Sequence, residues 1–193
     1  MGILKKILPP IREDALRQFC YDIGGKFLEG GALQVNKVQA CIREHTITFD
    51  TYTVAISEYG IIYTRVCAPY IDKDSFRFKI YQKGFGEDIV NSFSLPRIKV
   101  GSPEFDNEYI VRSNHAEKTR SLFSNSAIKE LVRSQTPFSL EIKKVHPNKE
   151  CYSKEVELYF EAPTIINDTE HFKMLYRLFA ETLAYLSPTE TLR

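Results

Sequence analysis

Residues 98–132, IKVGSPEFDNEYIVRSNHAEKTRSLFSNSAIKELV, decide how this chain folds. A short extended run over 98–100 ends at Gly101-Ser102-Pro103. The acidic residues 104–108 then form a predicted turn, and 109–113 return as a second strand. The segment therefore begins as two strands joined by an acidic turn.

A strand-to-helix junction follows at Asn114. Asn is a favourable N-cap, and Glu117, three residues later, completes an Asn version of the capping box. Ser124 or Asn125 can then cap a second short helix. The apolar residues of this second helix repeat at helical spacing: Ile128, Leu131 and Val132. We expect both short helices to pack over a sheet.

Strands dominate residues 34–82. Residues 45–57 and 61–70 are rich in β-branched side chains and are separated by a turn at 58–60, which predicts a long hairpin. The alternation of apolar side chains changes face near Asp50, which predicts a bulge there.

Three further strands are marked by alternating apolar and polar residues. Residues 76–81 alternate most clearly, so one face of this strand is expected in the core and the other in water. Residues 138–142 and 156–160 are expected to pair antiparallel, joined by a loop over 146–154. Residues 84–95 can hold a short helix.

Helices flank the strands in sequence. Residues 12–28 keep one apolar stripe at helical spacing, weakened at Gly24-Gly25 and stopped at Gly30-Gly31. A long C-terminal helix begins after Asn167 or Asp168. Its apolar stripe is continuous and comprises Phe172, Leu175, Tyr176, Phe179, Leu183 and Leu186. The sequence therefore predicts an α+β domain, a mainly antiparallel sheet packed by an N-terminal and a long C-terminal helix.

Length and composition favour one domain in the cytoplasm. The 193 residues contain no linker or repeat, so we expect a single domain over 1–193, with 1–10 as a flexible tail or a segment that docks on a membrane or partner. Lys and Arg number 26 against 25 for Asp and Glu, which leaves no global field for nucleic acid or membranes. No run of residues is long and apolar enough for a transmembrane helix.

The four cysteines are widely spaced, and we expect reduced, mostly buried thiols: Cys20, Cys41, Cys67 and Cys151.

The order of these elements resembles a loose group of uncharacterised bacterial domain-of-unknown-function proteins. The resemblance rests on Phe105-Asp106-x-x-Tyr109-x-Val111, on Arg112-Ser113-Asn114 before a Leu- and Phe-rich helix, on Leu158-Tyr159-Phe160, and on the capped helix after Asn167-Asp168. In the first half, Tyr63-Thr64-Arg65-Val66 and the segment from Phe76 to Tyr81 look similar as well. The resemblance implies no activity and no catalytic residue.

No local motif indicates catalysis. Glu104, Asp106 and Glu108 superficially resemble the clustered oxygen ligands of a metal loop, but the EF-hand spacing is absent and Asp106 is expected to bind backbone N–H groups of its own turn. The four histidines, His45, His115, His146 and His171, show no paired metal-ligand spacing. We expect neither a metal nor a cofactor, although a catalytic site assembled from distant residues remains an alternative.

A set of basic residues between 60 and 100 is the candidate binding surface. These strand cations are Arg65, Arg77, Lys79, Lys83, Arg97 and Lys99, with Tyr63, Tyr70 and Tyr81 among them. Basic faces with aromatic residues can bind single-stranded nucleic acid or anionic lipid headgroups. The near-zero net charge instead predicts that Arg65, Arg77 and Lys79 are solvated surface charges.

The sequence thus favours a non-catalytic cytoplasmic binding or interaction module that acts on a protein partner. Its speculative binding residues are Arg65, Arg77, Lys79 and Arg97. The alternatives are an enzyme with a dispersed site and a peripheral binder of anionic lipid or nucleic acid.

Overall fold

The computed structural model describes residues 13–31, 34–56, 59–84, 95–135, 137–145 and 155–188. The strands are β1 Lys26–Leu28, β2 Lys37–Ile42, β3 His45–Ile56, β4 Tyr59–Ile71, β5 Phe78–Gln82, β6 Arg97–Ile98, β7 Tyr109–Ser113, β8 Ser139–Lys144 and β9 Glu155–Ala162. The helices are α1 Glu13–Asp22, α2 Pro103–Glu108, α3 Ala116–Ser124, α4 Ser126–Arg133 and α5 Thr169–Leu186.

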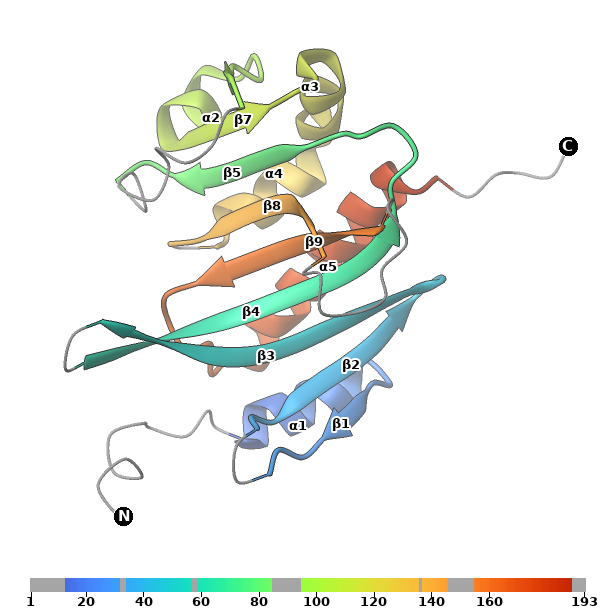
Figure 1. Cartoon of the computed structure of the whole chain (residues 1–193), viewed down its shortest axis with the longest axis vertical. Coiled ribbons are helices and arrows are strands. Elements are labelled where there is room, and N and C mark those ends of the chain that lie inside the picture. Colours follow the sequence, from blue (N-terminus) through green and yellow to red (C-terminus); the bar gives the residue numbers. More distant parts are fainter. Residues whose placement is uncertain are drawn as a thin grey trace, which may run out of the picture.

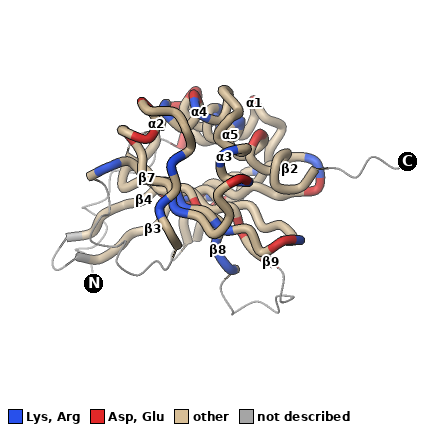
Figure 2. Tube along the Cα trace, turned by 90° about the horizontal axis from the view of Figure 1, so that it is seen from above, with Lys and Arg blue, Asp and Glu red and all other residues tan. Residues whose placement is uncertain are grey.

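These strands form one antiparallel sheet, in the order β1-β2-β3-β4-β9-β8-β5-β7-β6. All five helices lie on one face of the sheet, with α1 and α5 behind its lower and middle strands in Figure 1 and the helix layer above the sheet in Figure 2. The predicted α+β architecture, with an N-terminal and a long C-terminal helix on a mainly antiparallel sheet, is confirmed.

The central stretch folds largely as predicted, with two corrections. The strand β7 and the helix α4, which Asn125 caps through its side-chain oxygen, match the expectation. The acidic turn is instead the short helix α2, because Pro103 favours a first helical turn and Phe105 is buried beneath it. His115 rather than Asn114 is the N-cap of α3, and its Nδ1 accepts from the Lys118 N–H at 3.2 Å.

Asn114 bonds the backbone of a neighbouring segment instead of capping α3. Its side-chain oxygen accepts from the Arg77 N–H at 2.8 Å, and its amide donates to the Ser75 carbonyl at 2.7 Å. Asn114 therefore links the residues just before β5 to the end of β7. Because His115 is the N-cap, the predicted capping box of Asn114 and Glu117 does not form.

The N-terminal helix is shorter than predicted. The Gly25 N–H bonds the Cys20 carbonyl at 2.8 Å and the Gly24 N–H bonds that of Tyr21 at 3.2 Å, the paired bonds of a Schellman C-cap. Gly24 has φ 63°, which glycine adopts without steric cost. The helix thus ends at Asp22, and the predicted helical residues 26–28 pair with β2 as the edge strand β1.

The long hairpin of β3 and β4 contains no bulge. Its register is continuous from Thr48 opposite Cys67 to Ile56 opposite Tyr59. The apparent change of face at Asp50 has a different origin. The strand β4 pairs with β9 only from Thr64 to Ile71. Residues 59–63 of β4 therefore pair with β3 alone and project from the sheet as a two-stranded ribbon, where the alternation of apolar side chains no longer marks the core face.

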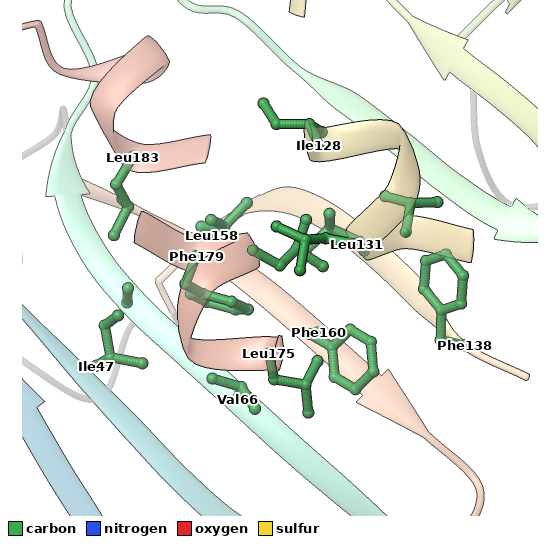
Figure 3. Packing of buried hydrophobic residues seen from close by; sticks show 14 of the residues in the cluster. Ile47, Val66, Ile128, Leu131, Phe138, Leu158, Phe160, Leu175, Phe179 and Leu183 are labelled. Carbon is green, nitrogen blue, oxygen red and sulfur yellow. The ribbon is translucent and has the colours of Figure 1, made fainter. Parts of the chain in front are cut away.

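The helix α5 packs on the centre of the sheet, as its apolar stripe predicted. Figure 3 shows Leu175, Phe179 and Leu183 pointing at the central strands, and all three are fully buried. Tyr176 is only partly buried, although it was predicted to be buried with them. The buried side chains around them come from several elements, including Ile47, Val66, Ile128, Leu131, Phe138, Leu158 and Phe160.

The pair of β8 and β9 confirms the predicted antiparallel neighbours. The predicted tail 1–10, most of the short helix at 84–95, and most of the loop at 146–154 lie outside the described residues.

Candidate anion-binding hollow

The face of the sheet opposite the helices, here called the helix-free face, carries alternating charges from neighbouring strands. It includes Asp50 and Tyr52 on β3, Arg65 and Cys67 on β4, Tyr159 and Glu161 on β9, Glu141 on β8, and Lys79 on β5. Three of the six strand cations form ion pairs with carboxylates on this face or at its margin.

Arg65 is neutralised by Asp50, its direct cross-strand neighbour. The guanidinium donates from Nε and Nη2 to the two carboxylate oxygens at 2.7 and 2.6 Å. This bidentate geometry is the strongest form of the Arg–carboxylate contact. Asp50 is 4% exposed, and Lys37 Nζ lies 3.6 Å from the same carboxylate.

Arg77 and Lys79 are also paired. Arg77 Nη1 donates to Asp72 at 2.5 Å and to the Phe76 carbonyl at 2.6 Å. Lys79 Nζ lies 3.5 Å from Glu141 Oε1, and these two side chains belong to residues that are only 7% and 8% exposed. The expectation that Lys79 is a solvated surface charge is therefore wrong. Tyr81, on the same supposedly wet face, is also buried.

Two tyrosines share one carboxylate oxygen beside these pairs. Tyr52 and Tyr159 donate to Glu161 Oε2 at 2.7 and 3.2 Å. Burial raises the pKa of both phenols, and the bond to Glu161 raises that of Tyr52 further, so both hold their protons as donors. Burial also lowers the pKa of Lys143, whose Nζ lies 2.9 Å from the Tyr159 ring centroid.

The other three strand cations have no ion pair with a described residue, and they gather around one hollow. Lys83 follows β5, Arg97 lies on β6, and Lys99 follows β6. All three are exposed and line a cavity of about 660 Å³. Of the four residues predicted to bind a ligand, the structure thus places only Arg97 here and sets Arg65, Arg77 and Lys79 in ion pairs elsewhere.

A tight loop contributes the rest of the lining of the hollow. The Asp106 carboxylate accepts from the N–H groups of Val100 at 2.9 Å and Gly101 at 3.2 Å, as expected for a residue that bonds its own turn. Gly101 has φ 88°, a left-handed conformation that favours glycine. Asn107 and Pro103 complete the lining.

The neighbouring carboxylates do not assemble a metal site. Glu104 and Glu108 each lie 3.4 Å from the Arg133 guanidinium. Among the residues that the structure describes, no three His, Cys, Asp or Glu side chains are grouped so as to hold a metal ion.

The described histidines are structural or isolated. His171 Nε2 bonds the fully buried Gln135 Oε1 at 2.7 Å, and burial lowers the pKa of its imidazole. His115 caps α3, and His45 lines a second cavity together with residues at the end of β4 and after α5. His146 is outside the described residues.

The described cysteines form no disulfide with one another. Cys20 is buried and Cys67 partly buried, with the Cys67 pKa raised to about 11 by burial, but Cys41 is exposed. The expectation of buried thiols is thus wrong for Cys41. Cys151 lies outside the described residues, and no helix among those described is long and apolar enough to cross a membrane.

A comparison of the chain with known proteins finds no matching family model, no matching curated protein and no matching solved structure.

Proposed function

We propose that this protein is a non-catalytic binding module of the cytoplasm that holds a small phosphate-bearing anion in the hollow lined by Lys83, Arg97 and Lys99. The observation that supports the proposal is the division of the strand cations. Three are neutralised by carboxylates, whereas the three around the hollow form no ion pair with a described residue, although the Asp106 carboxylate lines the same hollow.

Three like charges around one cavity repel one another, and a bound anion relieves that repulsion. The Arg97 guanidinium supplies a planar fork suited to two phosphate oxygens, and the two ammonium groups act as point charges beside it. The Asp106 carboxylate repels a bound anion less than a free carboxylate would, because both of its oxygens already accept backbone N–H bonds. The cavity of about 660 Å³ also falls in the usual range for small-molecule sites.

The same observations disfavour a long polyanion as the ligand. Nucleic acid and anionic membranes are recognised by many cations spread along a face, and affinity grows with the number of phosphates neutralised. Here the net charge is +1, and Arg65, Arg77 and Lys79 are already paired. A compact ligand with one or two phosphates therefore fits better than a strand or a bilayer.

Calorimetric titration with pyrophosphate tests the proposal. The triple variant Lys83→Gln, Arg97→Gln, Lys99→Gln should lose at least about tenfold in affinity, because each exposed charge contact contributes about 0.5 kcal/mol. The wild-type affinity should also fall as salt rises from about 0.05 to about 0.2 M, since these charges are exposed and screened.

A matched control changes three exposed cations outside the hollow, Lys26→Gln, Lys144→Gln and Arg177→Gln, and removes the same formal charge. This control should bind pyrophosphate like the wild type. Equal weakening in both triple variants would mean that only net charge matters, and no heat with pyrophosphate would overturn the proposal. Binding of an acidic peptide but not pyrophosphate would redirect the site to a protein partner.

A further inference from the structure

The hairpin of β3 and β4 continues beyond the strands on either side of it. The strand β2 covers β3 only as far as Phe49, and β9 covers β4 only from Thr64 onward. Residues 50–56 and 59–63 therefore lack an outer neighbour among the described strands, and Figure 1 shows this part of the hairpin projecting past β2 and β9. This part is here called the projecting ribbon.

One hydrogen bond shows which backbone groups of the projecting ribbon face outward. The Thr64 N–H bonds the Thr164 carbonyl at 3.0 Å, so it points away from β3. Residues directly opposite each other in an antiparallel pair share their orientation, and Thr51 is opposite Thr64. The orientation repeats at every second residue, so the N–H and C=O groups of Thr53 and Ala55 point away from β4, and both residues are exposed.

This outer edge of β3 carries none of the features that usually keep edge strands apart. Soluble proteins protect such edges with Lys, Pro, bulges or inward-pointing charges. Residues 51–56, TYTVAI, contain no charged residue, Pro or Gly, and their register with β4 is continuous. The edge is therefore suited to another strand, and an uncharged strand of high β-propensity fits it.

Two exposed apolar side chains lie beside each other on the projecting ribbon. Val54 is 37% exposed and Ile61 is 38% exposed, and the two are direct cross-strand neighbours. They lie on the helix-free face, because Val54 follows Asp50 and Tyr52 at alternate positions of β3. A strand added to the outer edge of β3 would lie next to Val54 and extend this apolar surface.

We propose that two copies of the chain pair through this edge, with their β3 strands antiparallel about a two-fold axis at Val54. The N–H and C=O groups of Thr53 then exchange hydrogen bonds with those of Ala55 in the second copy, and the reverse. Val54 lies opposite its own copy, so Ile61, Val54 and their two counterparts form one apolar row across the axis. The strand is thus its own complement, and no like charges oppose each other.

The strand β2 fixes the position of the axis. An axis at Thr53 would bring the second copy's hairpin opposite Phe49, where β2 already lies. An axis at Val54 keeps the second hairpin short of Phe49, and an axis nearer the tip of the ribbon would lose hydrogen bonds. The dimer closes at two copies, because each β3 edge is then used.

Sedimentation equilibrium of the full chain from about 1 μM to about 1 mM tests the proposal over the range of affinity expected for a small interface. The wild type should pass from monomer to dimer and no further. Thr53→Pro removes one outward N–H and should weaken the dimer at least about tenfold. Ile62→Pro removes an outward N–H from the opposite edge of the same ribbon and should dimerise like the wild type.

A pair of charged variants separates loss of the contact from loss of the fold. Val54→Lys and Val54→Glu should each be monomeric, because like charges would face each other across the axis. A mixture of the two should form a heterodimer, since opposite charges then meet there. Val35→Lys, at another exposed apolar position, should dimerise like the wild type.

Four results would overturn the proposal. They are a wild type that stays monomeric at about 1 mM, growth beyond the dimer, dimerisation of Val54→Lys alone, and a mixture of the two Val54 variants that stays monomeric.

Discussion

Asp50 shows why single residues on the helix-free face were hard to interpret from the sequence. It is a carboxylate in the middle of a β-branched strand, and the sequence suggested a bulge at its position. In the structure it is buried because Arg65 lies directly opposite and binds both of its oxygens. The register of the hairpin places Arg65 opposite Asp50, and this register cannot be read from the sequence alone.

Removal of one partner of this pair should be strongly destabilising. Arg65→Met leaves the Asp50 carboxylate buried with only Lys37 near it, and breaking a buried pair in this way costs about 3–5 kcal/mol of the free energy of unfolding. The double variant Asp50→Leu, Arg65→Met should recover much of that loss, since no unpaired charge remains. Urea denaturation of both variants and the wild type measures the cycle.

The control for this cycle is Lys26→Met, at an exposed position of β1 without an ion pair to a described residue. It should change stability by less than about 0.5 kcal/mol. Equal destabilisation by the single and double variants would show that the Arg65 stem, rather than its charge, supports the sheet.

The candidate site was predictable only in part for the same reason. The sequence indicated all three cations of the hollow among six basic residues, but only Arg97 was among the predicted binding residues. It could not separate Lys83, Arg97 and Lys99 from Arg65, Arg77 and Lys79. That division depends on carboxylates that folding brings from elsewhere, including Glu141 from a strand far along the chain.

At the scale of elements, local signals predicted most of the structure. Strong periodicity located α5, and a good N-cap located α4. The failures have two physical causes. A Schellman cap at Gly24 outweighed the helical spacing of the residues after it, and tertiary pairing made a strand of 26–28. In the acidic segment, burial of Phe105 made a helix of a sequence that reads as a turn.

The helix α5 provides the sharpest test of packing. Leu175 is fully buried against the sheet, so Leu175→Ala should lower the free energy of unfolding by about 2–5 kcal/mol through lost contacts and the remaining cavity. Arg177→Ala, two residues away on the exposed side of the same helix, should change it by less than about 0.5 kcal/mol. Thermal or urea denaturation compares them, and a Leu175→Ala curve that overlays the wild type would refute the packing described for α5.

For the whole molecule, the decisive property is one continuous apolar core. Buried side chains from every helix and from β2 and β7, the strands next to the two edge strands, belong to a single cluster. The phenylalanine contacts extend from Phe19 on α1 to Phe49 and Phe172, and a second group extends from Phe105 to Phe123 and Phe78. No internal boundary separates the two ends of the sheet.

Unfolding should therefore occur in one cooperative transition. Circular dichroism in the far ultraviolet reports the helices and strands, and tyrosine fluorescence reports side-chain packing without interference, since the chain has 11 Tyr and no Trp. The two probes should give the same urea midpoint within error. Two separate midpoints would indicate that the β1–β4 end and the β5–β8 end unfold as independent units.

The position of β9 between β4 and β8 has a consequence for synthesis of the protein. A nascent chain leaves the ribosome from its N-terminus, so β4 emerges long before β9, its partner. Until β9 appears, both β4 and β8 present unpaired edges, and such edges readily pair with other chains. We therefore expect the half-built sheet to be most prone to aggregation in the interval between the synthesis of β4 and that of β9.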